Sequence, residues 1–124
     1  MTGKGLRILI VEDHPGIRRL TAECFREAQF ETFEAGNGED ALSILAHQHP
    51  IHAVVMDLQM PVLDGIAATQ KIRADQRFMQ VRIYAFSGGP SLPGFNAALF
   101  DRFFTKPMLP ERLVGAILGD LAGR

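Results

Sequence analysis

Residues 54–65, VVMDLQMPVLDG, combine the features that decide the fold. An apolar, β-branched run ends on Asp57, passes through Met60-Pro61 and turns at Asp64-Gly65. Such a run is typical of a strand that is covered on both faces in a parallel sheet. A charged side chain is expected at its end only where the strand reaches the rim of the sheet, because burying a lone carboxylate is costly. Asp57 is therefore the first candidate for a functional residue.

Two strand-then-helix units precede this stretch. Residues 6–11 (LRILIV) form a strand-like run, and over residues 14–28 the apolar positions switch to helical spacing. Residues 30–35 predict a second, weaker strand. The following helix can be capped by Asn37 and must end before Pro50.

The chain after Gly65 continues the same alternation. It predicts a helix at 64–75, a strand at 81–87, a short strand at 102–105 and a last helix that Pro110 opens. Residues 88–99 contain three glycines and two prolines, so a helix there can be little more than 95–100.

Strands that alternate with helices imply right-handed crossovers and a parallel sheet with helices on both faces. The chain has 124 residues, which is the length of one domain, and we expect residues 1–124 to form a single unit. Its content of 47% hydrophobic and 22% charged residues is ordinary for a globular protein. The predicted fold class is a doubly wound α/β domain with five strands.

Composition excludes several classes of function. The net charge is −1 and no basic stripe is present, so direct nucleic-acid binding is not expected. No apolar run approaches the roughly 20 residues that cross a bilayer, and the first residues do not resemble a signal peptide. We therefore expect no membrane insertion and a cytoplasmic location.

Cysteine and histidine receive structural roles. Cys24 has no partner for an internal disulfide, and helical spacing places it with Ile17, Leu20 and Ala28 on one face, which we interpret as core packing. The four histidines do not share a ligand spacing and are interpreted as surface or packing residues: His14, His47, His49 and His52.

Polar side chains stand at the carboxyl ends of four predicted strands, which is where doubly wound sheets bind their ligands. They are Glu12 and Asp13 after the first strand, Asp57 after the third, Ser87 after the fourth and Lys106 after the fifth. Asp13 also stands where a helix cap is favoured and can serve as both cap and ligand.

The acids at these strand ends point to a metal. Adjacent strands lie about 4.8 Å apart, so Glu12, Asp13 and Asp57 would repel one another without a cation. Hard oxygen ligands suit Mg²⁺ better than a softer metal. A carboxylate beside Mg²⁺ and the ammonium of Lys106 is arranged to attack a phosphoryl group.

Four motifs together resemble the receiver domain of two-component response regulators. They are VEDHP at 11–15, MDLQMPVLDG at 56–65, a strand that ends in Ser87, and TKP at 105–107. The resemblance covers nearly the whole chain and implies a flavodoxin-like sheet with strand order 2-1-3-4-5. Residues 56–73 look especially like receivers attached to hybrid histidine kinases, which implies a phosphorelay.

The resemblance assigns a role to each candidate residue. It makes Asp57 the phosphoacceptor. For Mg²⁺, or Mn²⁺ as a substitute, it implies Asp13, Asp57 and the backbone carbonyl of Gln59 as ligands, and Glu12 as an acid that holds the metal through water. It makes Ser87 and Lys106 phosphoryl-binding residues, Ser87 and Phe103 the switch residues, and Lys106–Pro107 a cis peptide bond.

The function that the resemblance implies is phosphoryl transfer. A histidine kinase or a histidine phosphotransfer domain would present a phosphohistidine, Asp57 would accept the phosphoryl group, and a conformational switch would control an output partner. The acyl phosphate would then hydrolyse, so the chain would be a phosphoacceptor and not a small-molecule enzyme. Ser87 and Lys106 are nineteen positions apart, shorter than in familiar receivers by about one helical turn, so the fourth helix is expected to be shortened.

Two alternatives belong to other classes. The shortened fourth helix is compatible with a receiver-like interaction module that works without phosphorylation. A phosphoaspartate-forming hydrolase is disfavoured because Gln59 stands where a second acid, two positions after Asp57, would be needed. The glycine-rich stretch after Ser87 contains no phosphate-loop motif, so a nucleotide site is not expected.

Overall fold

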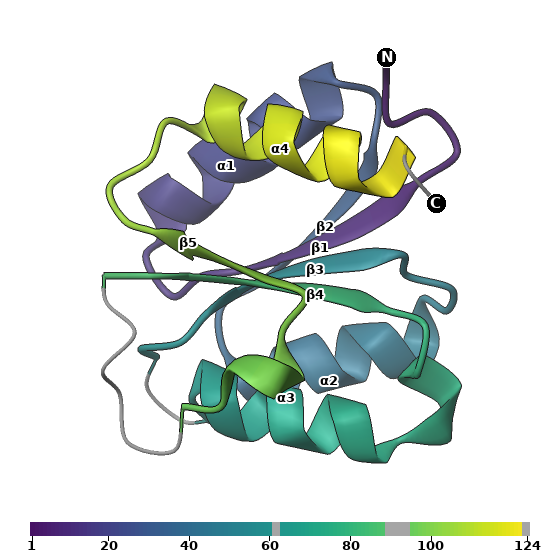
Figure 1. Ribbon diagram of the computed structural model, residues 1–124, viewed down its shortest axis with the longest axis vertical. Helices are drawn as coiled ribbons and strands as arrows, with labels where there is room; N and C mark the ends of the chain where they lie inside the picture. Colours follow the sequence, from purple (N-terminus) through teal and green to yellow (C-terminus); the bar gives the residue numbers. More distant parts are fainter. Residues whose placement is uncertain (61–62, 89–94, 123–124) are drawn as a thin grey trace.

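The computed structural model describes residues 1–60, 63–88 and 95–122 (Figure 1). The strands are β1 (Arg7–Val11), β2 (Glu31–Ala35), β3 (Ala53–Asp57), β4 (Arg82–Ser87) and β5 (Arg102–Thr105). The helices are α1 (Pro15–Glu27), α2 (Gly38–His47), α3 (Gly65–Ala74) and α4 (Pro110–Ala122). Two 3₁₀ turns complete the list, η1 (Gln76–Phe78) and η2 (Ala97–Leu99). Pro61 and residues 89–94, which entered the loop predictions above, lie outside the described residues.

The strands form one parallel sheet in the order β2-β1-β3-β4-β5. Helices α1 and α4 cover one face, and α2 and α3 cover the other (Figure 1). This arrangement confirms the predicted doubly wound fold with strand order 2-1-3-4-5. The order reverses between β1 and β3, so the ends of these two neighbouring strands form the crevice where ligands bind in such sheets.

The core has two layers because successive strand residues point to opposite faces of the sheet. In β1, Ile8 and Ile10 pack toward α1 and α4, whereas Leu9 and Val11 pack toward α2 and α3. Every residue of β3 is buried, including its terminal Asp57. The continuous apolar run therefore follows from burial on both faces, as the sequence predicted.

The described part of the connection between β4 and β5, residues 88 and 95–101, contains little helix. It holds the 3₁₀ turn η2, where the side chain of Asn96 accepts the backbone N–H of Ala98. The predicted helix at 95–100 is thus reduced to Ala97–Leu99. Aromatic rings take over part of the packing, because Phe95 and Phe100 both contact the layer under α2 and α3.

The interpretation of the core-facing side of α1 was wrong for Ile17 and Leu20. The buried residues of α1 are Thr21, Ala22 and Phe25, whereas Ile17 and Leu20 are 41% and 58% exposed. Cys24 is half-buried and packs against the core, as predicted. The large Phe25 ring occupies the side that meets the sheet, and at 100° per residue Ile17 and Leu20 lie about 80° and about 140° around the helix from it. These two residues are left beside the sheet and partly in contact with solvent.

None of the helices in the described ranges is long and apolar enough to cross a membrane.

A close contact between β3 and α3 gives a test of this packing. A methyl group on Gly65 would overlap the backbone carbonyl oxygen of Asp57, so Gly65→Ala is expected to lower the free energy of unfolding by at least about 2 kcal/mol. Gly115 in α4 is the control, because no described atom lies within 4 Å of its would-be Cβ. Gly115→Ala should raise the free energy of unfolding by about 1 kcal/mol through helix propensity. Urea denaturation measures both, and equal effects of the two substitutions would contradict the packing.

Candidate functional site

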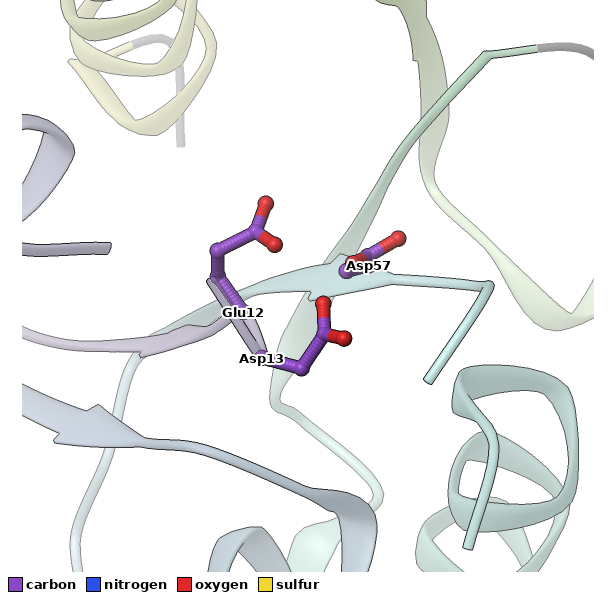
Figure 2. A group of neighbouring side chains, drawn as sticks. All are labelled: Glu12, Asp13 and Asp57. Carbon is purple, nitrogen blue, oxygen red and sulfur yellow. The ribbon is translucent and has the colours of Figure 1, made fainter. Parts of the chain in front are cut away.

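Three carboxylates meet at the carboxyl ends of β1 and β3 (Figure 2). Glu12 and Asp13 follow β1, and Asp57 is the last residue of β3, next to β1 in the sheet. One oxygen from each lies within 4.8 Å of the other two. Glu12 and Asp57 are each 5% exposed, whereas Asp13 is open to solvent. This is a cluster of hard oxygen donors with one open side.

Lys106 brings a positive charge into the cluster from the far side of β4. Its Nζ lies 2.6 Å from Oε1 of Glu12 and 3.7 Å from Oδ2 of Asp57. On the way the side chain passes Phe86, whose ring centroid is 5.3 Å from Nζ. The backbone amide of Lys106 donates to the carbonyl of Ser87, which fixes the start of this reach. One ammonium only partly offsets three acids, so a cation bound beside them would reduce the remaining repulsion.

Burial raises the pKa of Asp57 to about 7, although the backbone amide of Gln59 donates to its Oδ1 at 3.1 Å and lowers it. The neighbouring Glu12 carboxylate raises the pKa further, and the ammonium of Lys106 lowers it. Because this pKa lies close to neutrality, a proton and a metal ion compete for the same carboxylate.

The cap of α1 differs from the prediction. His14, not Asp13, is the cap, and its Nδ1 accepts the backbone N–H of Ile17 at 3.2 Å. The Asp13 side chain points to the other two acids instead (Figure 2). His14 therefore has a defined structural role beyond that of a surface residue, and its backbone N–H also donates to Oε2 of Glu12 at 3.2 Å. The exchange of roles leaves the Asp13 carboxylate available to the cluster.

Ser87 ends β4, one residue after Phe86, which pairs with Asp57. Its hydroxyl is fully buried and makes no hydrogen bond to any described residue. A buried hydroxyl without a partner costs about 1–3 kcal/mol, so the site favours a ligand that offers acceptor oxygens. This observation fits a phosphoryl group.

Of the remaining predicted residues, Gln59 and Lys106 lie at the same rim, whereas Phe103 does not. Gln59 is exposed and touches Asp57 through its backbone amide. The Lys106–Pro107 peptide bond is cis. Phe103 does not join the acids: it is half-buried in the layer under α2 and α3, where its ring packs edge-on against Phe95 with centroids 5.5 Å apart.

An apolar groove adjoins the acids and was missed by sequence reasoning. We call it the α1 groove; it is lined by Ile17, Leu20, Phe86, Lys106, Met108 and Pro110. Lys106 belongs to both the groove and the acidic cluster, so the two are continuous. Ile17 and Leu20 indicated this apolar surface in the sequence, because they lie on a different side of the helix from Phe25, but they were assigned to the core.

Residues 8–118 match the family described as response regulator receiver domain. The chain belongs to this family. The match contains all five strands except Arg7, and it contains the acidic cluster, so the site described above lies within the receiver domain.

Known relatives agree. The receiver domain is 30% identical over 118 residues to protein PilG of Pseudomonas aeruginosa, covering 91% of this chain and 85% of PilG. It is 33% identical over 117 residues to hybrid signal transduction histidine kinase A of Dictyostelium discoideum, covering 90% of this chain and 5% of that protein. The chain spans less than half of the length of several relatives that it matches.

A solved structure shares the fold. The response regulator receiver domain, described as CheY-like, from Methylobacillus flagellatus superposes with a TM-score of 0.82 at 26% identity. The match covers 94% of this chain and 98% of that one.

The pKa of Asp57 predicts a specific pH dependence. Folding raises this pKa, so the folded state holds the proton more tightly and the free energy of unfolding falls as pH rises from about 4 to about 7. Asp57→Asn should remove that loss and raise the free energy of unfolding at pH 8 by on the order of 1 kcal/mol. Mg²⁺ should stabilise the wild type at pH 8 and the variant much less. Urea denaturation at pH 5 and pH 8 measures these effects.

The control is Asp64→Asn, which changes an exposed carboxylate that caps α3 and whose replacement also caps helices well. It should leave the pH dependence and the response to Mg²⁺ unchanged. The same loss of pH dependence in both variants would contradict a special environment of Asp57.

Proposed function

We propose that Asp57 accepts a phosphoryl group from a phosphohistidine and that the resulting aspartyl phosphate controls a partner protein. The observation that carries this proposal is the position of one buried Asp57 carboxylate between the acids of β1 and the ammonium of Lys106. A carboxylate in such a setting can act as a nucleophile toward phosphorus. Membership of the receiver family supports the same reaction.

Each residue of the site has a part in the transfer. An oxygen of Asp57 forms a bond to phosphorus while the bond from phosphorus to the histidine nitrogen breaks, and that nitrogen keeps the electron pair. Mg²⁺, or Mn²⁺ in its place, held by Glu12, Asp13, Asp57 and the Gln59 carbonyl, would neutralise charge on the phosphoryl oxygens.

Lys106 and Ser87 bind the transferred group. The Lys106 ammonium lies 2.6 Å from Glu12 and 3.7 Å from Asp57, so a short movement exchanges its partner for a phosphoryl oxygen. The Ser87 hydroxyl donates to another phosphoryl oxygen, which satisfies a buried group that otherwise lacks a partner among the described residues. Hydrolysis of the acyl phosphate later restores Asp57. The domain is thus a stoichiometric phosphoacceptor and not a small-molecule enzyme.

Ser87 and Phe103 transmit the change. Phe103 pairs with Ala85, which lies two residues before Ser87 on β4. A shift of the Ser87 backbone therefore displaces β5 directly. The half-buried Phe103 ring can then change its packing, and the two packings define two states whose populations the phosphoryl group biases.

The phosphodonor docks in the α1 groove. A histidine kinase or a histidine phosphotransfer domain must bring its phosphohistidine to Asp57, and the groove is an apolar surface that continues into the site through Lys106. The relationship to a hybrid histidine kinase supports such a donor and a phosphorelay. We place the reaction in the cytoplasm, where ATP supplies these kinases.

Phosphorylation of the isolated domain tests the reaction. Incubation with acetyl phosphate and Mg²⁺ should add one phosphoryl group, detected by intact mass and removed by hydroxylamine, which cleaves acyl phosphates. Asp57→Asn should abolish the labelling because the nucleophile is lost. Asp64→Asn should be labelled like the wild type. Full labelling of Asp57→Asn would exclude Asp57 as the acceptor, and an unlabelled wild type would favour the phosphorylation-independent interaction module.

The α1 groove gives a second test. Leu20→Asp places a charge in the groove and should slow transfer from any histidine kinase that phosphorylates the wild type by at least about tenfold. Labelling by acetyl phosphate should stay unchanged, because a small donor needs no docking surface. Met79→Asp is the matched control, since Met79 is 65% exposed and follows η1, in the layer of α2 and α3. Equal slowing by both substitutions would place the docking surface elsewhere.

A further inference from the structure

Arg73, near the end of α3, joins three segments through all three nitrogens of its guanidinium group. Its Nε donates to the carbonyl of Leu99 at 2.9 Å, and a terminal nitrogen donates to the carbonyl of Val81 at 2.8 Å. The other terminal nitrogen donates to Oδ2 of Asp101 at 2.9 Å. One side chain thus fixes the end of η2, the residue before β4 and the residue before β5. We call this group of contacts the Arg73 anchor.

Asp101 makes the anchor part of the sheet. Its Oδ2 also accepts the backbone N–H of Ile83 at 2.7 Å, and its own backbone N–H donates to the Ile83 carbonyl at 2.8 Å. The β4–β5 pairing begins at the next residue, Arg102, which pairs with Tyr84. The Arg73 anchor therefore sets the position at which β5 joins the sheet.

β5 connects the anchor directly to the phosphorylation site. The strand contains four residues, preceded by Asp101 and followed by Lys106. At about 3.3 Å per residue, the anchor and the reactive lysine are separated by only about 16 Å of extended chain. The short strand has little freedom to stretch, so a displacement at one end reaches the other.

An aromatic cluster fills the space beside this strand. The rings of Phe95 and Phe100 stack with centroids 5.7 Å apart, and Phe95 meets Phe103 of β5 edge-on. Phe100 lies between Leu99 and Asp101, two partners of Arg73. The packing of the predicted switch residue therefore depends on the same anchor.

We propose that Arg73 is a positioning residue that acts through β5: it holds the strand where Lys106 pairs with Glu12, and it opposes the movement of Lys106 onto a phosphoryl group. This inference rests on the proposed function of Asp57 and adds the restraint that sets its phosphoryl affinity.

Thermodynamic linkage makes the proposal reciprocal. If the anchor disfavours phosphoryl binding, then phosphoryl binding must loosen the anchor by the same free energy. A purely structural ion pair would stabilise the bound and unbound states equally. Its removal would then leave the phosphoryl affinity unchanged.

A second ion pair in the same sheet provides the matched control. Arg82 at the start of β4 and Asp120 of α4 lie 3.2 Å apart, with side chains 29% and 27% exposed. The Arg73–Asp101 pair is 2.9 Å long, with side chains 23% and 29% exposed. The two pairs are similar in length and burial, but neither Arg82 nor Asp120 adjoins β5 in the sequence.

The test measures the binding of beryllofluoride, which mimics a phosphoryl group on a carboxylate, in the presence of Mg²⁺. Calorimetric titration should give an affinity about fivefold higher for Arg73→Met than for the wild type, and a value within twofold of the wild type for Arg82→Met. Asp101→Asn should also bind more tightly, and its remaining side-chain carbonyl can still accept the Ile83 amide. Equal or weaker binding by Arg73→Met and Asp101→Asn would overturn the proposal.

Amide exchange in the wild type provides a second measurement that needs no variant. Saturation with beryllofluoride should speed the exchange of the Asp101 amide, which donates to Ile83, and leave the Gln48 amide in the α2 cap unchanged. No change at Asp101 on binding would overturn the proposal even if the variants failed to fold. If the wild type bound no beryllofluoride, the proposed function of Asp57 would fail first. Tight wild-type binding with identical Arg73→Met and Arg82→Met affinities would remove only the role of Arg73.

Discussion

The close approach of Glu12, Asp13 and Asp57 at the ends of β1 and β3 is the constraint on which the rest of the site depends. The reversal of strand order makes β1 and β3 neighbours, so the backbone positions that carry the acids stay close as long as this central strand pair is intact. The apolar residues of both layers hold that pair in place. Burial raises the pKa of Asp57 to about 7, so the core stabilises a carboxylate in a setting that favours neutralisation by a proton, a cation or a covalent bond. The fold thus keeps three carboxylates close and buries one of them at the end of β3, which is the setting that the proposed reaction requires.

Lys106 moderates this repulsion from the edge of the sheet. It reaches Glu12 over Phe86, and its position depends on a strand of four residues. Among the described residues, the three hydrogen bonds of Arg73 hold the segment that precedes β5, and the stacked rings of Phe95 and Phe100 pack beside the strand. In the proposed mechanism, the position of Lys106 after β5 is therefore coupled through the strand to the position of Asp101 before it.

The orientation of α1 about its own axis decides which apolar residues are exposed beside the site. Phe25 enters the core, and Ile17 and Leu20 are left in the α1 groove. Exposed apolar residues next to a buried, charged site are suited to a protein donor, because the apolar contact supplies affinity and the charges supply orientation. The two kinds of surface share Lys106, so the proposed docking surface and the proposed reaction site meet at one side chain.

The sequence by itself determined the layered architecture of this protein and which residues form its site. Strand and helix periods predicted a doubly wound sheet, and parallel strands must end at one rim, so Glu12, Asp13, Asp57 and Lys106 could be expected together before any coordinates were known. The tertiary structure decided which partner each group chose. His14 rather than Asp13 caps α1, Lys106 pairs more closely with Glu12 than with Asp57, and Ile17 and Leu20 lie outside the core. Helix rotation and side-chain pairing depend on contacts between residues far apart in the chain, and local periodicity carries no information about those contacts.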